Sequence, residues 1–202
     1  MNVLVLDCDG VVVHPKNGRR WDQDLTRDLG IKPETLQSQF FQPNWRKIVC
    51  GEADLYETLE RVWPDLCAQV TVRDLVEYWF ARDAGMNEEV LSAVDAWRAR
   101  GGKAYLGTVQ EHHRAKYLWN ELGLSRRFDD IYYSAALGVC KPDEPFYAEV
   151  HRRLPVRDPR DVIFFDDAVR NVEAARAFGW QAHHFTKADD LRAVLTSASP
   201  TG

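Results

Sequence analysis

The sequence lacks a long apolar run, an excess of basic residues and any tract of low complexity. A membrane-spanning helix needs about 20 consecutive apolar residues, and the 202 residues contain no such run. With 31 acidic and 26 basic residues, the formal net charge is -5. This balance gives no basic footprint for nucleic acid or for an anionic membrane. We therefore expect a soluble globular protein whose partner is neither a nucleic acid nor a membrane.

Cysteine is also scarce, and no two cysteines form a Cys-x-x-Cys pattern. The four cysteines are Cys8, Cys50, Cys67 and Cys140. The apolar run at the N-terminus is too short for a signal peptide and has no basic leader before it. We therefore expect a cytoplasmic protein, in which these cysteines are free, buried thiols.

The N-terminal apolar run, Val3 to Leu6, is followed by two carboxylates one residue apart and then by a glycine. Its length and β-branched residues are typical of a buried strand. Residues two apart point to the same side of a strand, so Asp7 and Asp9 would lie together, while Gly10 permits a sharp turn. Such close carboxylates repel unless a cation or a shared proton lies between them, and Mg²⁺ would bind both. Taken alone, the pattern also fits a surface turn with two solvated aspartates.

The rest of the chain divides into a helical stretch and an alternating stretch. From about residue 21 to 99, apolar residues recur at helical spacing, and no segment has a convincing strand pattern. Beyond Gly101 and Gly102, strands alternate with helices. The predicted strands are 104–109, 131–134, 162–165 and 181–185. This alternation is typical of βαβ units in a parallel sheet.

We therefore expect an α/β domain built from residues 1–13 and 100–202, interrupted by an all-helical domain at 14–99. A helical insert beside a candidate site suggests a cap that excludes water. In this insert, Trp45, Arg46 and Lys47 would either meet the polar end of a substrate or serve as packing and as a solvated face.

Local signals predict where several helices begin and end. Thr71 with Asp74 resembles a capping box, and Asn87 is expected to cap the helix that follows it. Pro64 is expected to end the helix that begins near Leu55.

Polar residues recur at the ends of the predicted strands or in the loops that follow them. These residues are Asp7, Asp9, Thr108, Lys141, Asp166 and Asp167. The carboxyl ends of parallel strands lie at one edge of a sheet, where open α/β sheets bind ligands. Carboxylates, a hydroxyl and a lysine together suit phosphoryl transfer, because they hold a divalent metal and neutralise phosphate charge. An aspartate can itself be the nucleophile.

Four ordered motifs resemble those of the haloacid dehalogenase (HAD) superfamily of phosphohydrolases. They are Asp7-Cys8-Asp9-Gly10-Val11, Leu106-Gly107-Thr108, Lys141-Pro142-Asp143 and Phe164-Phe165-Asp166-Asp167, and the resemblance continues through Asn171 to Trp180. The resemblance implies a Rossmann-like parallel sheet with helices on both faces. It also implies a small all-helical cap inserted after the first motif, and Mg²⁺ as the cofactor.

The resemblance also implies catalytic roles. Asp7 would attack phosphorus and form an aspartyl phosphate. Asp9 would protonate the leaving oxygen and then act as a base on the hydrolytic water. Thr108 and Lys141 would bind the phosphoryl group. Val109 departs from the asparagine that many relatives have here, but its backbone N–H would still contact the phosphate.

For the metal, the resemblance implies ligands from the first and last motifs. Asp7, the backbone carbonyl of Asp9, and one or both of Asp166 and Asp167 would hold Mg²⁺. The motif favours Asp167 as the direct ligand and Asp166 as its partner through water or lysine.

Asp9 also bears on the type of reaction. Haloacid dehalogenases proper lack an acid at this position, because a halide leaves without a proton, whereas an alkoxide needs one. We therefore expect a magnesium-dependent phosphohydrolase that acts on a small phosphorylated metabolite. A sugar phosphomutase of the same superfamily would carry the same motifs. A non-catalytic phosphoacceptor or binding protein is a further alternative, although a receiver domain takes its phosphoacceptor from its third strand and has no long helical insert.

Overall fold

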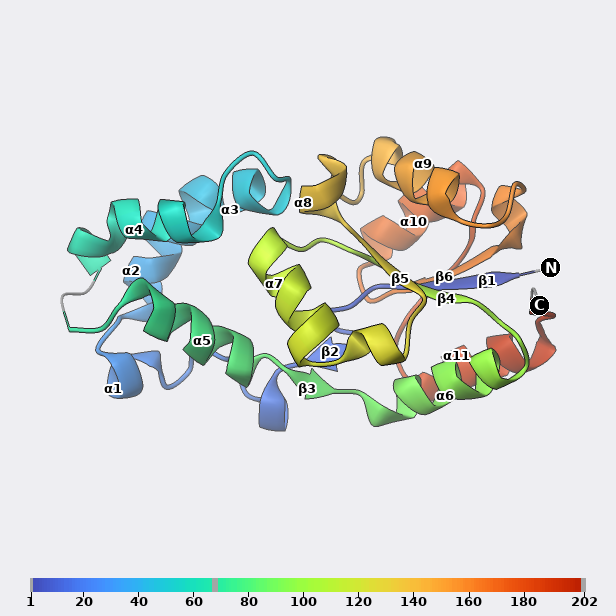
Figure 1. Ribbon diagram of the computed structural model, residues 1–202, viewed down its shortest axis with the longest axis horizontal. Helices are drawn as coiled ribbons and strands as arrows, with labels where there is room; N and C mark the ends of the chain where they lie inside the picture. The colour runs from blue at the N-terminus through green and yellow to red at the C-terminus, as the bar shows by residue number, and fades with distance from the viewer. Residues whose placement is uncertain (1, 67–68, 201–202) are drawn as a thin grey trace.

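The computed structural model describes residues 2–66 and 69–200, and a parallel five-stranded sheet lies at the centre of its larger part (Figure 1). The strand order is β5-β4-β1-β6-β7, and every neighbouring pair is parallel. The strands are β1 (Val3–Leu6), β4 (Ala104–Thr108), β5 (Asp130–Tyr133), β6 (Val162–Asp166) and β7 (Gln181–His184). The predicted α/β class and its parallel sheet are therefore confirmed.

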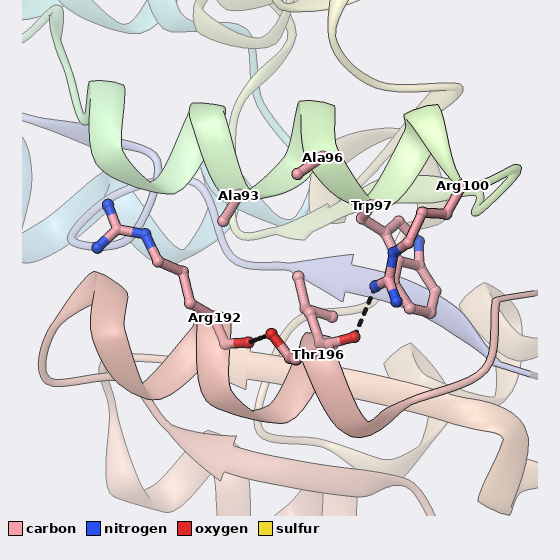
Figure 2. A pocket seen from close by; sticks show the side chains of 7 residues that line it. Ala93, Ala96, Trp97, Arg100, Arg192 and Thr196 are labelled. Atoms are coloured by element: carbon pink, nitrogen blue, oxygen red, sulfur yellow. Dashed lines mark hydrogen bonds between the residues drawn. The ribbon is translucent and has the colours of Figure 1, made fainter.

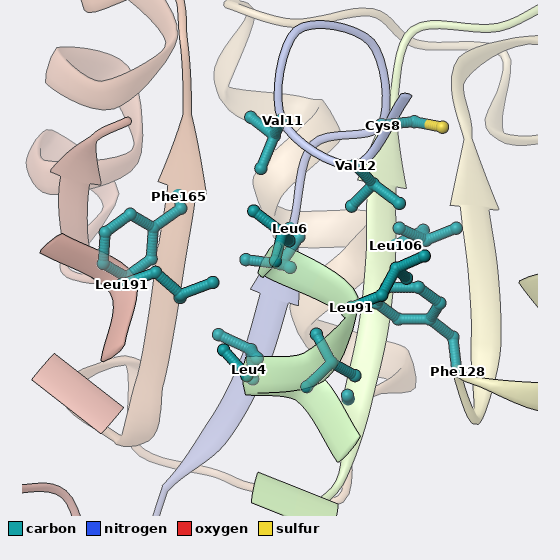
Figure 3. Close-up of a cluster of buried hydrophobic side chains, with 14 of the residues drawn as sticks. Leu4, Leu6, Cys8, Val11, Val12, Leu91, Leu106, Phe128, Phe165 and Leu191 are labelled. Atoms are coloured by element: carbon teal, nitrogen blue, oxygen red, sulfur yellow. The ribbon is translucent and has the colours of Figure 1, made fainter. Parts of the chain in front are cut away.

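Alternate residues of β1 face two different hydrophobic clusters, as the period of a strand requires. Leu4 and Leu6 pack into the cluster that covers one face of the sheet (Figure 3), whereas Val3 and Val5 pack into the cluster on the other face. Because both faces are covered, all four residues of β1 are buried.

Helices cover both faces of this sheet (Figure 1). Helices α6 and α11 contribute to the cluster around Leu4, and α9 and α10 contribute to the cluster around Val5. The helices of this larger part are α6 (Glu88–Ala99), α7 (His112–Lys116), η3 (Tyr117–Glu121), η4 (Leu124–Arg126), α8 (Ser134–Leu137), α9 (Glu144–Arg153), η5 (Pro159–Asp161), α10 (Val169–Phe178) and α11 (Ala188–Ser197).

A smaller helical part has a hydrophobic core of its own, in which Leu25, Phe40, Leu59 and Trp79 are buried. Its helices are α1 (Leu25–Leu29), α2 (Pro33–Leu36), η2 (Gln37–Phe41), α3 (Gln42–Val49), α4 (Leu55–Leu66) and α5 (Val72–Arg82). Among residues 2–66 and 69–200, no helix has both the length and the apolar character needed to cross a membrane.

Helix α6 packs on the sheet, although the predicted helical domain extends to Ala99. Leu91, Val94 and Trp97 are buried in the cluster that covers the sheet. The periodicity of this segment predicts the helix, but periodicity alone does not show which core a helix joins. The division into 1–13 with 100–202 and 14–99 stays a prediction, and the packing of α6 favours a second boundary near residue 87.

Two local signals are confirmed, and one is wrong. Thr71 and Asp74 form the capping box, and the Asn87 side chain accepts a hydrogen bond from the Val90 N–H at 3.3 Å. Pro64 does not end α4, which continues to Leu66. Proline has no N–H to donate to the Glu60 carbonyl, and α4 tolerates the loss of this one hydrogen bond.

The structure also contains a short pairing that the sequence does not predict. Strand β2 (Val13–His14) pairs antiparallel with β3 (Gly85–Met86), where the chain enters and leaves the smaller part, and η1 (Lys16–Gly18) follows β2. Strands of two residues are too short to give an alternating pattern.

A disulfide joins Cys50 to Cys140, so the expectation of four free thiols is wrong for this pair. Their Cα atoms lie 5.9 Å apart, within the usual range for a disulfide. Cys50 follows α3 of the smaller part, and Cys140 lies in the loop before α9, so their proximity depends on tertiary structure. Cys8 is free and buried, as expected, and Cys67 lies outside the described residues.

Replacing Cys50 by serine is expected to lower the melting temperature of the oxidised protein. The bond spans 90 positions of the chain, and closing a loop of this size stabilises a protein by up to about 4 kcal/mol. Thermal unfolding of both proteins, with and without dithiothreitol, measures the effect. Reduced wild type should melt close to the variant, and equal melting temperatures without reductant would contradict the prediction.

Candidate active site

The predicted site residues of β1 and β6 meet at one edge of the sheet. Leu6 lies opposite Phe165 in the register of these strands, so the residues that follow are neighbours. Asp7, Asp166 and Asp167 each offer a carboxylate oxygen, and these oxygens lie within 4.8 Å of one another. Within the described part of the chain, this is the one group of three or more His, Cys, Asp or Glu side chains placed to share a metal ion.

Lys141 is buried between two of these carboxylates. Its Nζ lies 2.9 Å from Asp7 Oδ1 and 2.6 Å from Asp166 Oδ2. Burial works to lower the pKa of Lys141, but the two carboxylates outweigh burial and raise it. The lysine is therefore a fixed cation that links the first motif to the last.

Burial raises the pKa of the Asp7 carboxyl to about 7, although the positive charge of Lys141 opposes this rise. The charge of Asp166 adds to it. When ionised, the three carboxylates and the one ammonium carry a formal charge of -2. Such a cluster is unfavourable in a buried place unless a cation or protons balance it. A divalent cation that prefers oxygen ligands, such as Mg²⁺, therefore fits the residues present.

Asp166 and Asp167 have different surroundings. Asp166 is buried and accepts hydrogen bonds from Lys141 at 2.6 Å, from the Ala168 N–H at 2.8 Å and from Asn171 Nδ2 at 3.0 Å.

Asp167 is exposed, and its carboxylate lies over Gly10. A Cβ at Gly10 would be 2.3 Å from Asp167 Oδ2, and Gly10 has φ +79°. Glycine is therefore required here both by the backbone conformation and by space.

Thr108 is buried at the end of β4, beside β1. Val109 places its side chain in a small apolar cluster with Val49, Cys50 and Cys140. The valine at this position thus faces the contact between the smaller helical part and the larger part that contains the sheet.

This contact is made by the end of α3, which lies beside α8 (Figure 1). The Ser134 hydroxyl donates a hydrogen bond to the Val49 carbonyl at 2.5 Å. A Cβ at Gly51 would lie 2.3 Å from the Ala135 carbonyl oxygen, so the two backbones approach closely. Arg46 pairs with Asp143 at 3.3 Å. The helical part is thus held next to the loop that carries Lys141.

A pocket of about 270 Å³ lies elsewhere, between α6 and α11 (Figure 2). Its residues lie in these two helices or, for Arg100, directly after α6, and Arg100 donates a hydrogen bond to the Leu195 carbonyl there at 2.6 Å. None of the predicted site residues lines it. The carboxylate cluster, not this pocket, is therefore the candidate active site.

A model of the haloacid dehalogenase-like hydrolase family matches residues 1–179. The chain belongs to this family. The curated relatives include the sesquiterpene phosphatase astK of Aspergillus oryzae, 33% identical over 92 residues, which are 44% of this chain and 45% of astK. The drimenol cyclase drtB of Aspergillus calidoustus is 38% identical over 72 residues, 35% of this chain and 13% of drtB. The chain thus spans less than half the length of these relatives.

Solved structures of HAD family enzymes share the fold. One from Bacteroides thetaiotaomicron, in complex with magnesium and inorganic phosphate, has a TM-score of 0.76 and 16% identity, and covers 91% of this chain and 93% of that chain. The L-2-haloacid dehalogenase from Xanthobacter autotrophicus has a TM-score of 0.64 and 18% identity, and the match covers 98% of this chain and 83% of the dehalogenase chain. Identities this low show a common fold alone.

Two contacts of this HAD-like hydrolase were not predicted from its sequence. Gln110 Nε2 donates a hydrogen bond to Asp9 Oδ2 at 2.6 Å, and Asn171 supports Asp166. Gln110 follows Thr108 by two positions, so a search for polar residues just beyond each motif would have selected it. Its partner, however, lies 101 positions away.

Proposed function

We propose that this protein is a magnesium-dependent phosphohydrolase that cleaves a small phosphate monoester through an aspartyl phosphate at Asp7. The observation that supports the proposal most is the cluster of Asp7, Asp166 and Asp167, with the buried ammonium of Lys141 paired to the first two. In this proposal the helical segment after β2 is the cap, held beside the site through α3.

The proposed metal ligands are Asp7, Asp167 and the backbone carbonyl of Asp9. Asp166 already accepts hydrogen bonds from three donors, so its proposed role is to orient Lys141 and the neighbouring ligands. When bound, Mg²⁺ would neutralise charge on the phosphoryl oxygens.

Asp7 is the proposed nucleophile. The Lys141 ammonium and the Cys8 N–H both donate to its Oδ1, at 2.9 and 2.7 Å, and so fix the orientation of the carboxylate. A bond forms from Asp7 oxygen to phosphorus as the ester P–O bond breaks, and Asp9 gives its proton to the leaving oxygen. Asp9 then takes a proton from water, which attacks phosphorus, releases phosphate and restores Asp7. Thr108, the Val109 N–H and Lys141 are proposed to bind the phosphoryl group.

Asp9 favours a phosphate ester over a carbon–halogen bond, because only the alkoxide needs a proton from the enzyme. This distinction matters, since dehalogenases are among the proteins that share the fold. A sugar phosphomutase remains the alternative activity, and it would yield an isomerised sugar phosphate in place of free phosphate.

A specific observation favours an apolar alcohol as the organic part of the substrate. Aromatic rings gather in the helical part, with Trp79 stacked on Trp21 at 5.2 Å and tilted against Trp45 at 5.6 Å. Trp45 also packs on the apolar cluster that contains Val109 and Cys140, the neighbours of Thr108 and Lys141. The similarity to a sesquiterpene phosphatase also favours an apolar alcohol. We therefore propose prenyl monophosphates as candidate substrates beside sugar phosphates.

Phosphate release from p-nitrophenyl phosphate in the presence of Mg²⁺ tests the proposed reaction. Removal of the metal by EDTA is expected to lower the rate at least about 100-fold, because the metal offsets several kcal/mol of charge repulsion, and added Mg²⁺ should restore it. A panel of farnesyl monophosphate and several sugar phosphates then tests the substrate class. The release of chloride from 2-chloropropionate, or of an isomerised sugar phosphate without phosphate, would contradict the proposal.

A further inference from the structure

Gln110 is a buried amide that contacts the proposed acid and base. It lies in the loop between β4 and α7, with 3% of its surface exposed. Its Nε2 lies 2.6 Å from Asp9 Oδ2. The contact is short and joins Gln110 to the first motif across 101 positions of the sequence.

The backbone of Gln110 is held on both sides, so its amide is not a freely moving side chain. Its N–H donates a hydrogen bond to the Ser134 Oγ at 3.0 Å, and its carbonyl accepts one from the Ala135 N–H at 3.2 Å. Ser134 is itself buried at the beginning of α8. The loop therefore presents the amide to Asp9 from a fixed position.

The chemistry of the pair restricts which oxygen of Asp9 transfers the proton. An ionised carboxylate only accepts hydrogen bonds, so the amide must present its NH₂ group to it. This donor remains on Oδ2 when Asp9 is protonated, which leaves Oδ1 to carry the proton. A general acid is effective only when its proton lies within hydrogen-bond reach of the leaving oxygen.

We propose that Gln110 is a positioning residue, which holds Asp9 in the orientation that protonates the leaving group. This inference rests on the proposed phosphohydrolase function and extends it to a residue outside the family motifs. A purely structural glutamine would stabilise the loop without affecting how strongly the reaction depends on the leaving group.

The test compares two esters that need acid catalysis to different degrees. p-Nitrophenolate leaves readily without a proton, whereas the alkoxide from n-propyl phosphate does not. The ratio of kcat/KM for the two esters is informative, because kcat/KM reports only the steps up to release of the alcohol. Gln110→Leu keeps the size of the side chain and removes the donor. It is expected to lower kcat/KM about 10- to 100-fold for the alkyl ester and less than about 3-fold for the aryl ester.

Three further variants complete the experiment. Asp9→Asn removes the acid completely, so its ratio of kcat/KM for the two esters is the reference value for full loss of acid catalysis. Gln110→Asn, whose amide is too short to reach Asp9, should change the ratio in the same direction, and it replaces Gln110→Leu if that variant fails to fold. Gln181→Leu makes the same chemical change at an exposed glutamine of β7 that donates to the Arg160 carbonyl, and it should leave the ratio unchanged.

The outcomes separate the two proposals. If the wild type hydrolyses both esters but Gln110→Leu and Gln110→Asn slow them equally, the positioning role is wrong and the phosphohydrolase function stands. If the wild type releases phosphate from neither ester, the function is wrong and the positioning role falls with it.

Discussion

Asp7→Asn is expected to lower kcat/KM for p-nitrophenyl phosphate at least about 10³-fold, the order of loss that follows removal of a catalytic group. An amide oxygen is too weak a nucleophile to form the phosphorylated intermediate. The fold should survive, because the amide oxygen can still accept hydrogen bonds from Lys141 and from the Cys8 N–H. Steady-state rates, together with acid-stable trapping of the ³²P-labelled protein, measure the effect.

Asp65→Asn is a matched control, because Asp65 is exposed on α4, away from the strand ends. It should keep the wild-type rate and the labelled intermediate. Folding of Asp7→Asn is checked by its thermal unfolding curve. A folded Asp7→Asn protein that retains wild-type activity would show that another group attacks phosphorus.

The positions of the main site residues could be predicted because they depend on a simple property of parallel sheets. Asp7 and Asp166 both follow apolar runs, and the carboxyl ends of parallel strands share one edge. Once the strands were recognised from their length and composition, the convergence of these residues followed. The resemblance to the family implied that Lys141 belongs to this site, whereas a lone lysine in a loop is usually solvated.

Several contacts that the sequence did not reveal join distant segments without a repeating pattern. Gln110 reaches Asp9 across 101 positions, and Cys50 pairs with Cys140 across 90. Neither pair has a periodicity, a cap or a turn that marks it locally. The sequence also does not show that α6 packs on the sheet, because the pattern of an amphipathic helix reveals its apolar face but not the surface that this face contacts.

Lys141→Met is expected to lower the free energy of unfolding by about 3 kcal/mol or more, because it leaves Asp7 and Asp166 buried without their cation. It should also reduce phosphatase activity by several orders of magnitude, since the proposed phosphate clamp is lost. Urea unfolding monitored by circular dichroism measures stability, and phosphate release measures activity. Added Mg²⁺ should recover part of the stability, because it binds the folded state.

Lys103→Met removes a lysine whose Nζ lies 2.9 Å from Asp129 Oδ1 at an exposed site, and a surface pair of this kind contributes less than about 1 kcal/mol. Lys103→Met is therefore the control for Lys141→Met. If both variants lost the same free energy of unfolding, the buried ammonium would not stabilise the carboxylate cluster.

The stability of Lys141→Met should also depend on pH in a defined direction. Burial already raises the pKa of Asp7 to about 7 although the charge of Lys141 opposes this rise, so the loss of Lys141 should raise this pKa further. The folded state then holds a proton that the unfolded state, with a carboxyl pKa of about 4, has released, so stability falls as the pH rises through this interval. The deficit relative to the wild type should therefore be smaller at pH 5 than at pH 8. A deficit that grows on acidification would mean that the loss of Lys141 does not raise the pKa of the folded carboxylate cluster, and would contradict the assignment of Lys141 as its cation.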